Sequence, residues 1–150
     1  MKSDTGKLPA LIDTNILLYA YAENSPKRKN AAELLEACVN GKAKHFLSLQ
    51  NIGEFCSVAI HKYGLDIQEV IETVEELLHT RNLVKVHYSG ETLQRALSIM
   101  KQSRISFWDA VLVATMKDNG IETIYSEDAT FRKVEGIKIR FVIKLNIAAV

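Results

Sequence analysis

Four carboxylates in this 150-residue sequence occupy positions that suit metal-dependent chemistry. Asp13 ends the apolar stretch that begins at Leu8, and Asp128 closely follows another apolar stretch. Glu54 and Asp109 lie near the starts of two predicted helices. If the apolar stretches are parallel strands, all four acids lie at one edge of a sheet. This is the edge at the carboxyl ends of the strands, where open α/β folds bind their ligands.

Such a group of acids predicts a bound cation. Carboxylates a few ångströms apart repel one another by several kcal/mol at an effective dielectric constant of about 20, and they raise one another's pKa unless a cation lies between them. An all-oxygen pocket suits Mg²⁺ or Mn²⁺. A hard divalent cation lowers the pKa of a bound water and stabilises the oxygens of an in-line displacement, so the pattern points to phosphodiester hydrolysis.

Each acid also has a purely structural interpretation. Glu54 and Asp109 each lie three residues after a residue type that commonly caps helices, as the acids of capping boxes do. Asp13 fits the N-cap of the next helix, and Asp128 fits a turn. Capping explains each of these residues well when it is considered alone. It is the coincidence of all four at one predicted edge that favours a metal site.

The elements that must position these acids alternate between strands and helices, which predicts an α/β domain with a parallel sheet covered on both faces. The expected strands are Leu8–Asp13, Lys44–Leu49, Leu83–Tyr88, Glu122–Tyr125 and Ile137–Ile143. The expected helices are Asn15–Tyr21, Ser25–Gly41 with Pro26 at its start, Asn51–Tyr63 capped by Asn51, Asp66–His79, Ser89–Gln102 and Ser106–Asn119 capped by Ser106. The helix over Phe107–Asn119 is apolar almost all round, so it belongs either in the core or in an interface with a partner.

The length predicts one domain, residues 8–150, preceded by a short flexible segment, residues 1–7. No apolar run is long enough to span a bilayer, and the N-terminus lacks the apolar core of a signal peptide, so we expect a cytoplasmic protein without a membrane partner. Cys38 and Cys56 form neither a disulfide framework nor a zinc pattern. The apolar segment Leu145–Val150 could pack on the domain or on a partner.

Charge alone does not indicate a nucleic-acid binder, because 19 basic and 18 acidic residues give a net charge of +1. If the four acids are metal ligands, however, 14 acidic residues remain against those 19 basic ones. The surplus could guide a polyanion past the acidic pocket. Candidate phosphate contacts are Lys27, Arg28, Lys29, Lys62, Arg104, Arg132 and Lys133.

Four short motifs together resemble those of the PIN-domain ribonucleases, most closely the VapC-like toxins of toxin–antitoxin pairs. They are Leu11–Asn15 (Leu-Ile-Asp-Thr-Asn), Asn51–Phe55 (Asn-Ile-Gly-Glu-Phe), Phe107–Ala110 (Phe-Trp-Asp-Ala) and Tyr125–Asp128 (Tyr-Ser-Glu-Asp). Each motif alone is weak, but all four occur in order at the ends of alternating elements, from Leu8 to about Val142.

This resemblance implies a three-layer PIN-like fold, a five-stranded parallel sheet flanked by helices, and Mg²⁺- or Mn²⁺-dependent endoribonuclease activity. It also implies a homodimer and a small antitoxin protein that covers the site. The metal-binding acids that it implies are Asp13, Glu54, Asp109 and Asp128. Thr14 matches the hydroxyl residue after the first acid, Asn15 matches the asparagine that steadies the loop, and Glu127 could share or replace the role of Asp128.

Three other hypotheses of function are alternatives to a PIN-like ribonuclease. A haloacid-dehalogenase-like phosphatase also has an aspartate at the end of its first strand, but it needs a second one two residues later, where this chain has Asn15. A PIN-like module could bind RNA or a protein without cutting. Finally, the acids could be caps and turn residues only, in which case no metal would stabilise the protein.

Overall fold

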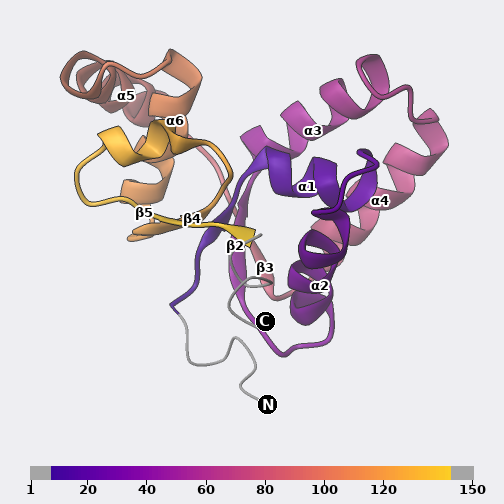
Figure 1. The fold of residues 1–150 in the computed structure, drawn as a ribbon. Helices are drawn as coiled ribbons and strands as arrows, with labels where there is room; N and C mark the ends of the chain where they lie inside the picture. The colour runs from indigo at the N-terminus through magenta and orange to yellow at the C-terminus, as the bar shows by residue number, and fades with distance from the viewer. Residues whose placement is uncertain (1–7, 143–150) are drawn as a thin grey trace.

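The computed structural model describes residues 8–142, and in this part of the chain five parallel strands form one sheet (Figure 1). The strands lie side by side in the order β3-β2-β1-β4-β5. Their bounds are Leu11–Ile12 (β1), His45–Ser48 (β2), Leu83–Val86 (β3), Thr123–Tyr125 (β4) and Lys138–Arg140 (β5). Leu11 pairs with Phe46 of β2 on one side and with Ile124 of β4 on the other. The predicted five-stranded parallel sheet is therefore confirmed, with β1 at its centre.

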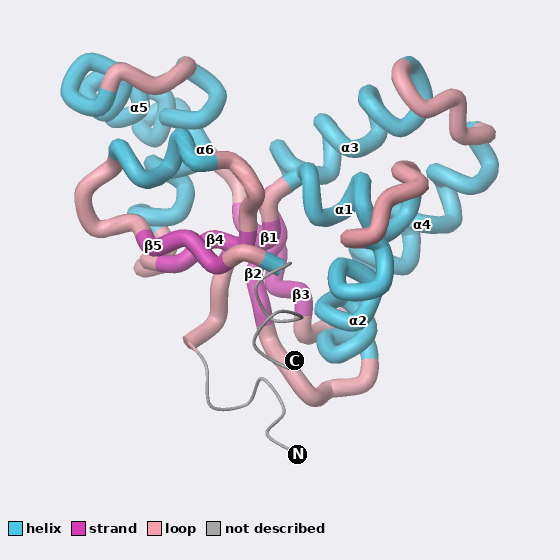
Figure 2. Tube along the Cα trace, in the orientation of Figure 1, coloured by secondary structure: helices cyan, strands magenta, loops and turns pink. Residues whose placement is uncertain are grey.

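Helices cover both faces of this sheet, as predicted (Figures 1 and 2). One face carries α1 (Thr14–Tyr21), α2 (Arg28–Val39), α3 (Leu49–His61) and α4 (Ile67–His79), and the other carries α5 (Gly90–Ser103) and α6 (Phe107–Asp118). A short 3₁₀ helix, η2 (Ala129–Lys133), connects β4 to β5. None of the helices within residues 8–142 has the length and apolar character needed to cross a membrane.

The strand order creates a topological switch point beside β1. The chain first builds the sheet outward from β1 through β2 to β3, and then returns to place β4 on the other side of β1. Where the direction of winding reverses in this way, the loops at the carboxyl ends of the two central strands diverge and leave room for a ligand. Asp13 comes directly after β1 and Ser126 directly after β4, so both lie at this switch point.

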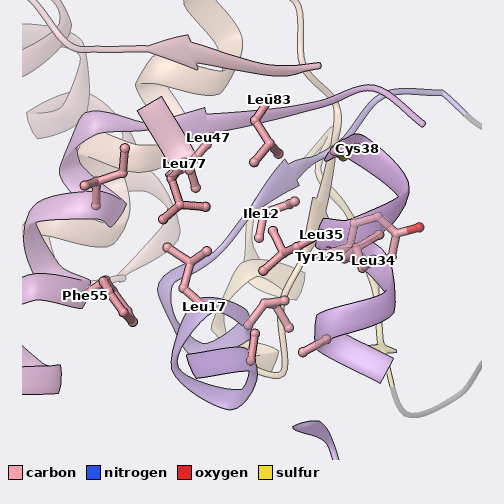
Figure 3. Packing of buried hydrophobic residues seen from close by; sticks show 14 of the residues in the cluster. Ile12, Leu17, Leu34, Leu35, Cys38, Leu47, Phe55, Leu77, Leu83 and Tyr125 are labelled. Carbon is pink, nitrogen blue, oxygen red and sulfur yellow. The ribbon is translucent and has the colours of Figure 1, made fainter. Parts of the chain in front are cut away.

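The core has two parts because successive residues of a strand point to opposite faces of the sheet. Ile12 and Tyr125 pack with the helices α1–α4, whereas Leu11 and Ile124 pack with α5 and α6. Figure 3 shows the first part, in which side chains from β1, α1, α3 and α4 interdigitate. Both faces of β1 are thus buried, which fixes the strand that directly precedes Asp13.

The most apolar helix, α6, belongs to the core. Every residue from Ala110 to Met116 is buried, and the helix packs against α5 and the sheet. Its all-round apolar character therefore arises because it is enclosed within the domain. In the first turn of α6, however, the side chain of Trp108 lies outside the core and is 50% exposed.

The first strand is shorter than the predicted Leu8–Asp13. Pro9 has no N–H to donate to a neighbouring strand, and the N–H of Ala10 donates to the ring of His45 instead of to a carbonyl of the sheet. The ladder therefore covers only Leu11–Ile12. The fifth strand is also shorter than predicted, Lys138–Arg140, and Ile143 lies outside the described residues.

The prediction that Asn51 caps the third helix is wrong. The cap is Ser48, whose hydroxyl accepts the N–H of Asn51 at 2.9 Å, and the helix begins at Leu49. Asn51 is completely buried and its side chain turns toward the end of β1. Glu54 consequently lies beyond the first turn of α3, so the capping-box interpretation of this acid is wrong as well.

The second helix begins later than predicted. Ser25 and Pro26 form a turn in which the hydroxyl of Ser25 accepts the N–H of Lys27, and α2 starts at Arg28. The segments 1–7 and 145–150, expected to be a flexible N-terminus and an apolar C-terminus, lie outside the described residues.

The residue that ends α5 has a left-handed backbone conformation. Arg104 ends this helix with a φ of 54°, the only positive φ of a non-glycine residue among those described. This left-handed conformation costs an L-residue about 1–2 kcal/mol. We therefore expect Arg104→Gly to raise the free energy of unfolding by about 1 kcal/mol in urea titrations. Gly120→Ala, at the left-handed residue after α6, should lower it by a similar amount, and a less stable Arg104→Gly protein would contradict this account.

Candidate active site

Asp13 is the buried centre of the polar residues at the switch point. It caps α1, and its Oδ1 accepts the N–H of Thr14 at 2.8 Å. Its Oδ2 accepts the hydroxyl of Ser126 at 2.7 Å. The pKa of Asp13 is raised to about 6, chiefly by burial; the bonds from Ser126 and Thr14 lower it, and the charges of Glu54 and Asp109 raise it further. The structural interpretation of Asp13 as a helix cap is correct, but capping does not explain this set of acidic neighbours.

A chain of hydrogen bonds links Asp13 to the start of α3. The Thr14 hydroxyl donates to Oε2 of Glu54 at 2.9 Å and accepts Nδ2 of Asn51 at 2.8 Å. The amide of Asn51 also lies 3.4 Å from Oδ1 of Asp13, and its Oδ1 accepts the hydroxyl of Ser48 at 2.7 Å. This network fixes the side chain of Thr14 between two of the candidate acids.

The side chain of Glu54 is exposed. In addition to the bond from Thr14, its Oε1 accepts Nε2 of Gln50 at 3.2 Å. The same Gln50 nitrogen donates to the backbone carbonyl of Trp108 at 2.9 Å. Gln50 therefore ties the first turn of α3 to the first turn of α6, and with it the Glu54 carboxylate to the segment that carries Asp109.

Asp109 approaches from the opposite face of the sheet. Ser106 caps α6 as predicted and accepts the N–H of Asp109 at 3.2 Å. Asp109 is half-buried, and burial is the main cause of its raised pKa. The charges of Asp128 and Glu54 raise the pKa of Asp109 further, whereas the bond from Ser106 lowers it. Asp109 is thus close enough to both acids to interact with them electrostatically.

The two acids after β4 have different surroundings. Asp128 is exposed and caps η2, its Oδ1 accepting the N–H of Thr130 at 2.9 Å. Glu127 instead pairs with Lys27, whose Nζ lies 3.4 Å from its Oε1 and also contacts Tyr19. Because Lys27 neutralises Glu127 and Asp128 acts on Asp109, the geometry favours Asp128 over Glu127 as the fourth acid.

The other predicted site residues do not cluster around Asp13. Asn15 is half-buried, and its Oδ1 is a buried oxygen without a hydrogen-bond partner among the described residues. Of the candidate phosphate contacts, Lys27 is paired with Glu127, and Arg132 lies over the ring of Phe141. Arg28 and Lys29 are exposed in the first turn of α2, whereas Lys62, Arg104 and Lys133 are exposed at the ends of α3, α5 and η2.

The chemistry of the donors fits a hard divalent cation. The side chains are carboxylates and a hydroxyl, and Asp13 and Asp109 have pKa values raised partly by their acidic neighbours. A cation between them would relieve this repulsion. As the side chains stand, no three His, Cys, Asp or Glu residues in the described part of the chain are close enough to hold one ion. Binding one ion through three of these acids would therefore require their side chains to move closer together.

The buried carboxyl of Asp13 makes the stability of the metal-free protein depend on pH. Since its pKa is higher in the folded chain, about 6 against 3.8, the folded state binds the proton more tightly than the unfolded state. The stabilisation is complete below about pH 4 and is lost as the pH rises through about 6. In excess chelator, we expect the free energy of unfolding of the wild type to fall by about 2–3 kcal/mol relative to Asp13→Asn between pH 4 and pH 8. A constant difference between the two proteins across this range would contradict the raised pKa.

Comparison with known proteins gives one family. A family model for the PIN domain matches residues 10–137 of this chain. The chain is 29% identical over 135 residues to ribonuclease VapC48 of Mycobacterium tuberculosis, a match that covers 85% of this chain and 93% of that protein. The helix and strand ends that carry Asp13, Glu54, Asp109 and Asp128 all lie within the matched region.

Several solved structures share the fold. VapC20 of Mycobacterium tuberculosis, described as a sarcin–ricin loop cleaving toxin, superposes with a TM-score of 0.70 at 17% identity, covering 87% of this chain and 98% of that one. The DNA-bound VapBC complex of Salmonella typhimurium gives 0.66 at 15% identity, covering 90% and 98%. A toxin–antitoxin complex from Klebsiella pneumoniae gives 0.63 at 22% identity, covering 85% and 94%.

Proposed function

This chain belongs to the PIN-domain family and is homologous to VapC ribonuclease toxins, and from this premise we propose that it is a Mg²⁺- or Mn²⁺-dependent endoribonuclease, the toxin of a toxin–antitoxin pair. The observation that carries the proposal is the convergence of Asp13, Glu54 and Asp109 at the switch point of the sheet. Their charges act on one another although they come from three separate segments of the chain.

Asp13, Asp109 and Glu54 would hold the ion, directly or through water, with Asp128 at the outer side. A bound Mg²⁺ or Mn²⁺ would supply a water of lowered pKa and stabilise the oxygens of an in-line displacement at phosphorus. Ser126 and the backbone of Thr14 fix the two oxygens of Asp13. Glu54 is exposed and held by Thr14 and Gln50, so its remaining lone pairs are free to orient the attacking water or accept its proton.

The contacts of Thr14 explain why a hydroxyl side chain at this position supports the proposed site. Thr14 donates to Glu54 and accepts from Asn51, and its backbone N–H binds Asp13. One residue therefore sets the relative position of two of the proposed ligands. Such outer contacts orient metal ligands and typically account for about 10–100-fold in affinity or activity.

A small antitoxin and a second copy of the chain are the proposed partners. The support is indirect: several structures with the same fold, including the Klebsiella pneumoniae complex and the Salmonella typhimurium VapBC complex, are toxin–antitoxin assemblies. Co-purification from the native host, with identification of any small protein that accompanies this chain, tests the antitoxin. The mass of the isolated chain in solution tests the dimer.

The direct test of the enzyme is incubation of the purified protein with structured and single-stranded RNA in Mg²⁺, in Mn²⁺ and in excess chelator. We expect cleavage only with metal, restored when metal is added back to the chelated sample. Folded protein that binds RNA but leaves it intact in both metals would overturn the nuclease and favour the non-cleaving binding module. Cleavage that persists in chelator would overturn the metal-dependent mechanism.

A further inference from the structure

A hollow on the surface adjoins the acidic site. It has a volume of about 270 Å³ and lies at the carboxyl edge of the sheet, between the first turns of α3 and α6 and the segment that follows β3. This is smaller than the roughly 300–1,000 Å³ of pockets for drug-sized ligands, so it suits a single ring system. Its lining residues are Leu49, Gln50, Gly53, Glu54, Tyr88 and Trp108.

The hollow is lined by two aromatic side chains and a leucine that are unusually exposed for large apolar residues. Trp108 is 50% exposed, Leu49 45% and Tyr88 39%. The rings of Tyr88 and Trp108 lie 6.1 Å apart, and Phe107 supports Trp108 edge-on at 5.1 Å. Large rings are seldom left in water on one spot without a ligand or partner. The indole is thus held in place by its neighbours while much of its surface remains open.

The hollow and the acidic site share one wall. Glu54 lines the hollow and also accepts the hydroxyl of Thr14 next to Asp13. Gln50 donates one amide nitrogen to Glu54 and to the carbonyl of Trp108, and Trp108 directly precedes Asp109. A molecule with an anionic group at the acids and a flat group attached to it therefore reaches both places at once.

We propose that this hollow binds one nucleobase of a single-stranded RNA segment, adjacent to the phosphodiester at the acidic site. The inference rests on the proposed function and adds a subsite to it. Nucleobases stack on aromatic side chains whatever their sequence. The polar atoms of the lining favour the base over the backbone: Glu54 is an anion that repels phosphate, whereas its oxygens accept the N–H groups of bases.

Trp108 itself reports on this contact, because it is the only tryptophan in the sequence. The test titrates Asp13→Asn protein, which should bind RNA without cutting it, with a short single-stranded oligonucleotide in Mg²⁺. The intrinsic fluorescence and the anisotropy of a label on the RNA are measured together. We expect the fluorescence to be quenched in parallel with binding. An oligonucleotide with the same phosphates but abasic sugars should bind about tenfold more weakly and leave the fluorescence unchanged.

Position 53 provides matched variants that leave the rings and the acids in place. A Cβ added at Gly53 would meet nothing within 4 Å, and Gly53 lies within α3, where other residues favour the helix more. Gly53→Leu should project into the hollow and weaken the binding of the normal oligonucleotide about tenfold, whereas Gly53→Ala should bind nearly as the wild type does. Leu97→Ala changes an exposed apolar residue of α5 outside the hollow and serves as the remote control.

The inference is overturned if RNA binds without quenching, if the abasic oligonucleotide quenches equally, or if Gly53→Leu alters the oligomeric state while its RNA affinity is unchanged. In the last case the hollow is an interface between copies of the chain. Cleavage by the wild type decides the proposed function separately. Quenching without cleavage would support the subsite and reject the nuclease, and cleavage without quenching would do the reverse.

Discussion

Replacing Asp13 with asparagine should reduce metal-dependent RNA cleavage by more than a hundredfold and, in chelator at pH 8, make the protein more stable. Asn keeps the shape of the side chain and an oxygen for the N–H of Thr14, but it removes the charge that would hold a metal. The expected loss exceeds the roughly 10–100-fold typical of outer-shell partners, because Asp13 is the proposed ligand itself.

The expected gain in stability has a separate cause. At pH 8 the wild type must keep an ionised carboxylate buried beside Glu54 and Asp109, and this raises the pKa of Asp13 to about 6. Removing the charge should raise the free energy of unfolding by about 2 kcal/mol. Adding Mg²⁺ or Mn²⁺ should then stabilise the wild type but have little effect on the variant, since only the wild type binds the ion well. Urea titrations with and without metal measure both effects.

Asp66→Asn is the matched control. Asp66 is also an N-cap, but it lies exposed at the start of α4, away from the acids, and Asn caps helices equally well. It should leave cleavage and metal stabilisation unchanged. If Asp13 were only a cap, Asp13→Asn would behave like Asp66→Asn in both assays. An Asp13→Asn protein of wild-type activity would therefore reject the metal site, whatever its stability.

The positions of the four acids could be predicted from the sequence because they depend on local order along the chain. Apolar stretches that stop at a polar residue indicate buried strands, and parallel strands all have their carboxyl ends at one edge. The charges of Asp128 and Glu54 on Asp109, and of Glu54 on Asp13, agree with that placement. The pattern contained no information on strand order, however. Ser126 donates to Asp13 only because β4 pairs with β1, across 113 residues of sequence.

One error arose where a short-range rule competed with a long-range contact. Ser48 and Asn51 are both good capping residues, and the choice between them depends on burial: Asn51 has hydrogen-bond partners at the end of β1, so it lies inside the helix. For the fourth acid, the motif in the sequence favours Asp128, with Glu127 as a possible substitute. Lys27, 100 residues earlier, distinguishes them by pairing with Glu127.

Asn51→Ala should have the second-largest effect, a loss of about 2–3 kcal/mol in the free energy of unfolding together with a 10–100-fold loss of cleavage. Asn51 is completely buried, and its amide joins Ser48 to Thr14. Alanine leaves both hydroxyls without this partner and opens a small cavity, and the cost of unmade buried hydrogen bonds exceeds the small gain in helix propensity. The Thr14 hydroxyl, which donates to the Glu54 carboxylate, then loses the hydrogen bond from Asn51 that holds it in place. The position of the Glu54 carboxylate is consequently less well fixed.

Asn119→Ala separates this effect from a generic loss of an asparagine. Asn119 also makes a side-chain hydrogen bond, from its amide to the carbonyl of Thr115, but it is exposed at the far end of α6. It should lose less than about 1 kcal/mol and no activity. The comparison is completed by measuring how much added metal raises the thermal unfolding temperature of each variant. Asn51→Ala should weaken this stabilisation because Thr14 and Glu54 are less well positioned. Asn119→Ala should leave it unchanged. If Asn51→Ala destabilised the fold but cut RNA at the wild-type rate below its melting temperature, the network would support the fold alone, and the acids would not depend on it for their positions.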